Sequence, residues 1–132
     1  MMQSAVLHFE SRAFAISPGE DERTNPGIFG EALANWVADQ LRAHAFQVGD
    51  VIAEDFGWCV PVAIKPYSVY VACASDSEGT DQWQLFVFAE GGLLNRLVGK
   101  DRRAEVVNSV FGAVKGAMES FSEIRNIEED PT

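Results

Sequence analysis

One long amphipathic stretch, residues 25–45 (NPGIFGEALANWVADQLRAHA), constrains the fold of this chain more than any other segment. It predicts a helix, because apolar side chains recur at intervals of three and four residues and form a single stripe. The stripe comprises Phe29, Leu33, Trp36, Val37 and Leu41. Asn25 is a suitable N-cap, and Pro26 suits the first helical position, where its missing N–H would have no partner. Such a helix must bury its stripe against an apolar layer of the protein.

Five shorter segments predict the strands of that layer, at residues 4–16, 46–53, 56–64, 67–74 and 81–90. The third and fourth segments favour a hairpin about residues 65–67. If its turn centres on Pro66, Cys59 lies opposite Cys73, and Trp58 shares a face with Tyr70. Both faces of this hairpin are apolar, which is typical of a sheet that is covered on both sides, or on one side by the protein and on the other by a partner.

A second long helix is predicted over residues 101–124, with Asp101 as its cap, after a short helical turn at residues 93–98. The order is therefore β-α-β-β-β-β-α, and the fold class is α+β. We expect an antiparallel sheet of about five strands with both long helices packed on one face. The first strand joins the sheet at an edge or inserts into it. Residues 1–124 form one domain, and residues 125–132 are expected to be a disordered acidic tail.

Charge restricts the kind of partner. The 132 residues carry a net charge of −10. Residues 1–95 hold 13 acidic and 4 basic side chains, a field that repels nucleic acid and anionic membranes and favours a basic partner protein. The alternative is that acidity serves solubility only. The apolar runs are too short to cross a bilayer, and the N-terminus lacks the basic region of a signal peptide, so we expect a cytoplasmic protein.

The segment EDFGWC (residues 54–59) is the most suggestive for chemistry. Cys59 could act as a nucleophile with His8 or His44 as its base and Asp55 as the residue that orients the base. Glu54 and Asp55 could also work as an acid and base pair. The competing interpretation is a charged loop that leads into a core strand, in which Cys59 is a small buried apolar residue. Spacing ties neither histidine to Cys59, and we predict no catalytic residue.

Metal and cofactor signals are weak. The two histidines and two cysteines lack the close spacing of a ligand set, and two cysteines are expected to remain thiols. Asp76, Glu78 and Asp81 flank Gly79 without the ligand order of an EF-hand. No glycine-rich phosphate loop is present. We therefore predict no metal and no cofactor.

Two strings, PGEDERTNPGIFG (residues 18–30) and AEDFGWCVPV (residues 53–62), resemble segments of small bacterial proteins of uncharacterised function. The resemblance covers roughly the N-terminal half and implies a bacterial or phage setting, without any activity, cofactor or site residue. In that setting, small acidic domains without motifs often serve as inhibitors or immunity proteins, which is an analogy only.

Three hypotheses follow. The first is a non-enzymatic acidic domain that binds a basic protein, such as a toxin or a nucleic-acid-binding enzyme. Inhibitors and immunity proteins are examples of such domains. The domain itself would contact neither nucleic acid nor membrane. Its contact residues would be Glu20, Asp21, Glu22, Glu54 and Asp55, with Trp83 as an anchor at the rim. The second is a small enzyme or ligand-binding domain with a pocket between helix and sheet near Asp55, Trp58 and Cys59. The third is a homodimer formed through the second sheet face or the small-residue side of the last helix.

Overall fold

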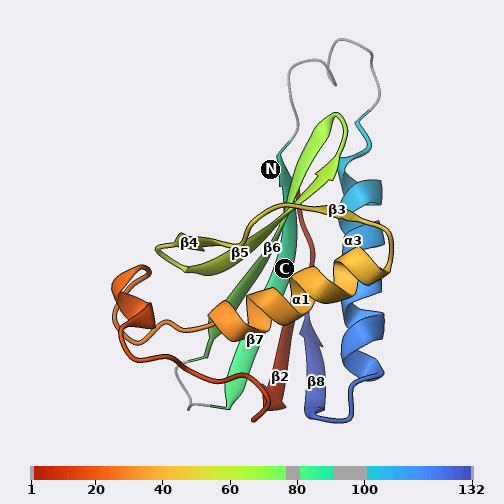
Figure 1. Cartoon of the computed structure of the whole chain (residues 1–132). Coiled ribbons are helices and arrows are strands. Elements are labelled where there is room, and N and C mark those ends of the chain that lie inside the picture. Colours follow the sequence, from red (N-terminus) through yellow and green to blue (C-terminus); the bar gives the residue numbers. More distant parts are fainter. Residues whose placement is uncertain (1, 77–80, 91–100, 132) are drawn as a thin grey trace.

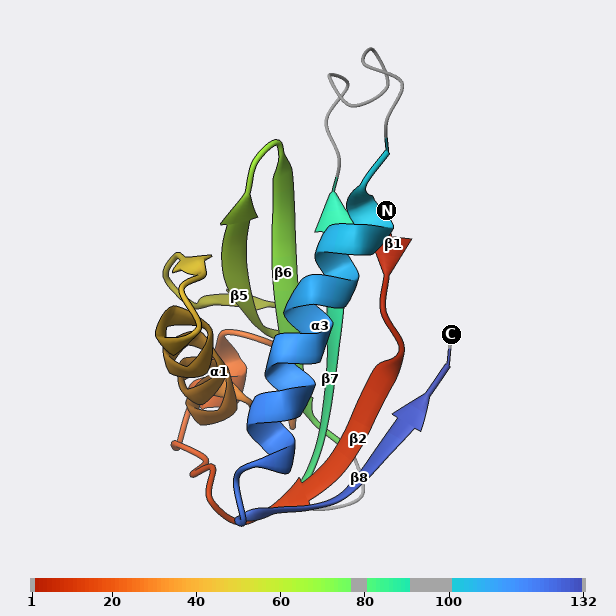
Figure 2. The same ribbon diagram turned by 90° about the vertical axis from the view of Figure 1, so that its right-hand side faces the viewer.

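An antiparallel sheet with two helices on one of its faces makes up the structure, a computed structural model that describes residues 2–76, 81–90 and 101–131 (Figure 1 and Figure 2). The helices are α1 (Glu31–Ala43) and α3 (Arg103–Glu119), and a 3₁₀ turn η1 spans Glu20–Glu22. The strands are β1 (Met2–Gln3), β2 (Val6–Ser11), β3 (Gln47–Val48), β4 (Ile52–Glu54), β5 (Gly57–Ile64), β6 (Tyr67–Ser75), β7 (Gln82–Glu90) and β8 (Ile124–Asp130). The α+β class, the antiparallel sheet and the placement of both helices on one face are thus confirmed.

The sheet has eight strands instead of about five, and its order differs from the prediction. The strands lie in the order β3-β5-β6-β7-β2-β8, with β1 paired to β7 and β4 paired to β5. One predicted segment, residues 46–53, is divided into β3 and β4, whereas residues 4–16 contribute only β2. Two further strands, β1 before β2 and β8 after α3, lie outside the predicted strand segments. The hairpin of β5 and β6 continues into β7 and forms an antiparallel meander. The first long strand, β2, is inserted between β7 and β8.

The C-terminal segment is a strand and not a disordered tail. β8 pairs with β2, and Ile124 at its start is 7% exposed. The ladder shifts register between His8 and Glu10, and Asn126 of β8 has a positive φ of 55°. The disorder prediction was wrong because charged residues dominate this segment, and the partner strand that orders it is more than 100 residues away in the chain.

The β5–β6 hairpin has a different register from the predicted one. Lys65 and Pro66 form a two-residue turn, so Ile64 pairs with Tyr67 and Cys59 pairs with Ala72. A shift of one residue exchanges the two faces of a strand. Trp58 therefore shares a face with Cys73, and Cys59 lies on the opposite face with Tyr70. Both cysteines are free thiols, on opposite sides of the sheet.

Helix α1 begins five residues later than predicted, and Asn25 does not cap it. The Asn25 side chain donates to the Asp55 carbonyl at 2.9 Å. Gly30, with a φ of 151°, is the residue before the helix. The Glu20 carboxylate caps the helix by accepting the backbone N–H groups of Gly30 and Glu31 at 2.7 and 3.0 Å.

The core lies between the helices and the sheet (Figure 2). Leu33, Val37 and Leu41 of the predicted α1 stripe are fully buried. Helix α3 is shorter than predicted and buries its own stripe against β7 and β1. The ring of Trp36, in the middle of α1, stacks on the ring of Phe121, just beyond the end of α3, with centroids 5.4 Å apart. Neither described helix is long and apolar enough to cross a membrane. The helical turn predicted at residues 93–98 lies outside the described residues.

Candidate functional site

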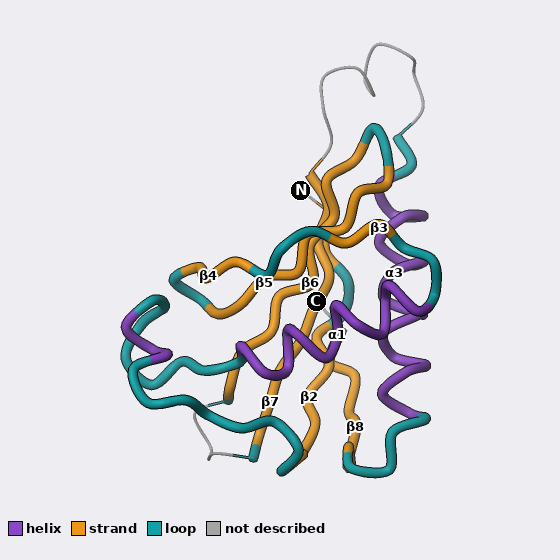
Figure 3. The backbone as a smooth tube through the Cα atoms, in the orientation of Figure 1, coloured by secondary structure: helices purple, strands orange, loops and turns teal. Residues whose placement is uncertain are grey.

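The face of the sheet opposite the helices is open in the described structure. In Figure 1 and Figure 3, α3 lies on one side of the sheet, α1 crosses in front of the strands toward α3, and the β4–β5 hairpin projects away from α3. The pairing register identifies the side chains on this open face, because paired residues point to the same side of a sheet. On the central strands they include Cys59, Pro61, Tyr70, Ala72, Gln84, Phe86 and Phe88.

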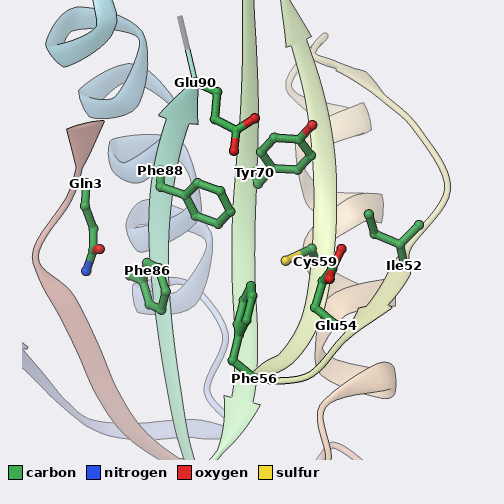
Figure 4. Close-up of a pocket in the computed structure, with 9 residues that line it drawn as sticks. All are labelled: Gln3, Ile52, Glu54, Phe56, Cys59, Tyr70, Phe86, Phe88 and Glu90. Atoms are coloured by element: carbon green, nitrogen blue, oxygen red, sulfur yellow. The ribbon is translucent and has the colours of Figure 1, made fainter. Parts of the chain in front are cut away.

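A groove of about 520 Å³ crosses the open face (Figure 4). Aromatic rings form much of it: Tyr70 and Phe88, opposite each other on β6 and β7, stack with centroids 5.2 Å apart, and Phe86 lies 5.9 Å from Phe88. The β4–β5 hairpin forms one wall with two exposed apolar side chains, Ile52 (39% exposed) and Phe56 (46% exposed). The groove is lined by Gln3, Ile52, Glu54, Phe56, Cys59, Tyr70, Phe86, Phe88 and Glu90. Its size falls in the range of ligand-binding clefts.

Carboxylates surround these rings. Glu54 and Glu90 line the groove itself, and neither has an ion-pair partner among the described residues. Toward the β8 edge, the register places further carboxylates on the same face, those of Glu10, Glu128 and Asp130. Arg125 is on this face too, but it pairs with Glu10 at 3.2 Å. The described part of the open face therefore combines an apolar centre with a strongly negative periphery.

Cys59 lies at the bottom of the groove and is 2% exposed. Burial, and then the negative charge of Glu54, raise the pKa of its thiol to about 12. The neutral thiol is a poor nucleophile. His8 is on β2, three strands away from β5, and its ring faces Asp76 and Asp130 at 3.5 and 3.8 Å. His44 follows α1 on the helical side. The proposed pairing of Cys59 with a histidine base is not formed.

Two predicted contact residues are inside the fold. Glu20 is 2% exposed, and its carboxylate is occupied by backbone N–H groups. Trp83 is 1% exposed, faces the helices, and donates its indole N–H to the Ser11 carbonyl at 3.0 Å. The polar neighbours of Trp83 suggested a rim position, but they alternate with it and point to the open face. Neither residue is available to a partner.

The other predicted contact residues are only partly brought together. Glu22 is exposed in η1, and the neighbouring Asp21 accepts the Gly27 N–H at 2.8 Å. The hydrogen bond from Asn25 to the Asp55 carbonyl places this acidic loop beside the β4–β5 turn. Glu54 is the one predicted contact residue that lines the groove. Tyr70, Phe88 and Glu90 were not predicted as site residues, although the alternation Phe86-x-Phe88-x-Glu90 is a signal of one shared face.

The alternative pocket near Asp55, Trp58 and Cys59 is not assembled. Trp58 faces the helices, where the Arg23 guanidinium lies 4.7 Å from the centre of its ring, and Cys59 faces the other side of the sheet. The indole N–H of Trp58 has no hydrogen-bond partner within the described structure. No group of three or more His, Cys, Asp and Glu side chains is placed to hold a metal ion in residues 2–76, 81–90 and 101–131. Glu78 and Gly79 of the EF-hand comparison lie outside those ranges.

The chain matches no protein-family model, no curated protein and no solved structure in the three comparisons. The open face of the sheet is therefore the feature of this protein that indicates a function.

Proposed function

We propose that this protein is an acidic binding domain that recognises a basic partner protein through the open face of its sheet. The observation that carries the proposal is the groove in which the rings of Tyr70 and Phe88 lie between the carboxylates of Glu54 and Glu90. Protein interfaces concentrate binding energy in aromatic centres surrounded by a polar rim. This groove has an aromatic centre, and the charged side chains described on its rim, Glu54 and Glu90, are both negative.

Charge separates this proposal from two others. Aromatic side chains on an open sheet can also stack nucleic-acid bases, but such sites track the phosphates with positive charge. Here Glu54, Glu90 and Glu128 would repel a phosphate backbone. A second copy of this chain is disfavoured for the same reason, because two such faces would bring carboxylates against carboxylates.

The chemistry of the groove also favours binding over catalysis. Cys59, the thiol that lines it, has a raised pKa and no histidine beside it. What the groove supplies is apolar area, ring faces and negative charge, which are properties of a recognition surface. An inhibitor or immunity-type role is a narrower form of the same proposal.

The test is a pull-down with three forms of the full chain at low and high salt, with bound proteins identified by mass spectrometry. The forms are wild type, Glu54→Gln with Glu90→Gln, and a control with Asp39→Asn and Glu119→Gln on the helical side. Both double variants change the net charge equally, so only the location of the charge differs. Circular dichroism and a melting curve establish that all three are folded.

We expect a basic protein that wild type and the control retain at low salt, that high salt releases, and that the Glu54/Glu90 variant loses. Exposed charges are screened within about 8 Å at physiological ionic strength, which gives the salt dependence. A basic protein held equally by both double variants would place the interface elsewhere and overturn the proposal. So would the absence of any salt-sensitive basic protein from the wild-type sample.

A further inference from the structure

One corner of the groove joins ring faces to the carboxylate of Glu90, which forms no ion pair with another described residue. Tyr70 and Phe88 are directly opposite on β6 and β7, and Glu90 is two residues beyond Phe88 on the same side of β7. Residues in diagonal positions of an antiparallel pair are about 7–8 Å apart, which is within reach of long side chains. Figure 4 shows the Glu90 carboxylate and the two rings in the same corner.

Resting on the proposed function, we propose that this corner, formed by Tyr70, Phe88 and Glu90, is the subsite that receives an arginine side chain of the partner. The guanidinium would lie on the aromatic pair and donate hydrogen bonds to the Glu90 carboxylate. The apolar stem of the arginine would pack toward Phe86 inside the groove.

The combination of groups selects the ligand. A cation is attracted to the face of an aromatic ring, and the attraction grows where water is partly excluded. A carboxylate beside the ring adds a charge-assisted hydrogen bond, which can be bidentate for arginine. The planar guanidinium can stack and donate at once, whereas the ammonium of lysine is a compact and strongly hydrated point charge. The same packing already occurs within this protein, where Arg23 lies over the ring of Trp58.

Competing cations within the described structure do not fill the corner. Glu90 is exposed and makes no ion pair with a described residue. Among the described residues, the nearest arginine on this face by register is Arg125 on β8, two strands away from β7, and Arg125 is already paired with Glu10. A partner arginine would therefore meet a carboxylate that is not neutralised by these groups.

The experiment uses a defined probe, the peptide acetyl-Gly-Leu-Arg-Leu-Gly-amide, and two peptides with citrulline or lysine in place of arginine. Citrulline has nearly the shape of arginine but no charge. Each peptide is titrated at low salt into the full-length ¹⁵N-labelled protein, and the shifts of backbone amide signals are followed. The variants are Glu90→Gln and Phe88→Leu, with Phe111→Leu as the control because Phe111 lies on α3, on the other side of the sheet. Melting curves verify that each variant is folded.

We expect the arginine peptide to shift signals of β6 and β7 around Tyr70 and Glu90, with an affinity about 10-fold above that of the citrulline peptide, the size of one charge-assisted contact. The lysine peptide should fall between them. Glu90→Gln should remove most of the preference for arginine over citrulline. Phe88→Leu should weaken arginine binding about 3-fold or more, and the control Phe111→Leu less than 2-fold.

Equal affinity for arginine and citrulline, or an arginine site whose affinity is unchanged by Glu90→Gln, would overturn the subsite. Its failure is separable from that of the proposed function. If a basic protein is still captured through Glu54 and Glu90 while the peptides show no arginine preference, the open face is the interface and the arginine subsite is wrong. If no basic protein depends on those carboxylates, the proposed function fails first.

Discussion

The Glu20 carboxylate lies 2.7 Å from the backbone nitrogen of Gly30, and this contact sets where helix α1 begins. The second carboxylate oxygen accepts the Ser17 N–H at 3.2 Å. One buried side chain thus closes the loop over residues 17–30 and satisfies N–H groups at the start of the helix. A negative charge at this position also complements the helix dipole.

Glu20→Gln should destabilise the fold by about 1–3 kcal/mol, because an amide offers only one acceptor oxygen and turns its NH₂ toward a backbone donor. Urea unfolding followed by tryptophan fluorescence measures the change. Glu22→Gln in the same loop is the control, since Glu22 is exposed, and it should alter the free energy of unfolding by no more than about 0.5 kcal/mol. Equal effects of the two variants would refute the capping role.

Gly57 is held against the neighbouring strand. It has a φ of 149°, and a Cβ added there would lie 2.5 Å from the Cys73 carbonyl oxygen. Gly57→Ala should therefore destabilise the protein by about 1–3 kcal/mol, because the added methyl group would clash with the backbone of the paired strand and strain it. Gly112→Ala is the matched control, because this helical glycine has open space around it, and it should stabilise by about 0.5–1 kcal/mol. Thermal unfolding of both variants checks the opposite signs.

Cys59 should alkylate slowly in the native protein. Burial and Glu54 raise its thiol pKa to about 12, so the thiolate is scarce at neutral pH. Glu54→Gln removes a negative charge that disfavours the thiolate, so the pKa should fall and alkylation by iodoacetamide at pH 9 should accelerate. Rates are measured by mass spectrometry of the Cys59 peptide. A rate unaffected by this variant would show that access alone limits the reaction.

The same thiol contributes a pH dependence of stability. Its pKa is higher in the folded chain than the ordinary value of 9.0, so its contribution is fully present below pH 9 and is lost as the pH rises toward about 12. Cys59→Ala should therefore show a shallower fall in the free energy of unfolding over this window than wild type. Denaturant titrations at pH 8, 9 and 10 follow the onset of the difference, and parallel curves would contradict it.

Trp83→Phe should lower stability without lowering affinity for a partner. The substitution leaves the Ser11 carbonyl, now bonded at 3.0 Å to the indole N–H, without that donor, and it reduces buried apolar volume. We expect a loss of about 1–3 kcal/mol. Peptide titrations of the folded variant should match wild type, and a specific loss of binding would restore Trp83 as an anchor.

β8 should protect its backbone amides from hydrogen exchange. Amides of residues 124–130 that pair with β2 should exchange at least about 10-fold more slowly than in an unstructured peptide. Asn126 has a φ of 55°, so Asn126→Gly should be tolerated, whereas Asn126→Val should reduce protection across the strand. Exchange at unstructured rates throughout residues 124–130 would restore the disordered tail.

The prediction of which residues share each face of the β5–β6 hairpin was wrong, because the two strands pair in a different register. Alternation in residues 56–64 and 67–74 was enough to predict two strands and a hairpin, because the period of two is a local property. Which face receives Cys59 depends on the number of residues in the turn, and Pro66 is compatible with more than one turn length. The difference of one residue places Trp58 on the same face as Cys73, and Cys59 on the same face as Tyr70.

The sequence by itself determined the periodic elements and the net negative charge of the protein. The periodic elements are the stripe of α1 and the meander of β5 to β7, and the excess of acidic side chains favours a basic partner. These depend on neighbours within a few residues or on totals. Only the tertiary structure decided that Glu20 caps a helix that starts eleven residues later, that β8 is ordered by β2, and that Tyr70, Phe88 and Glu90 share a corner. The physical reason is that caps, strand partners and shared faces are contacts between segments distant in the chain, and local patterns do not specify which segments meet.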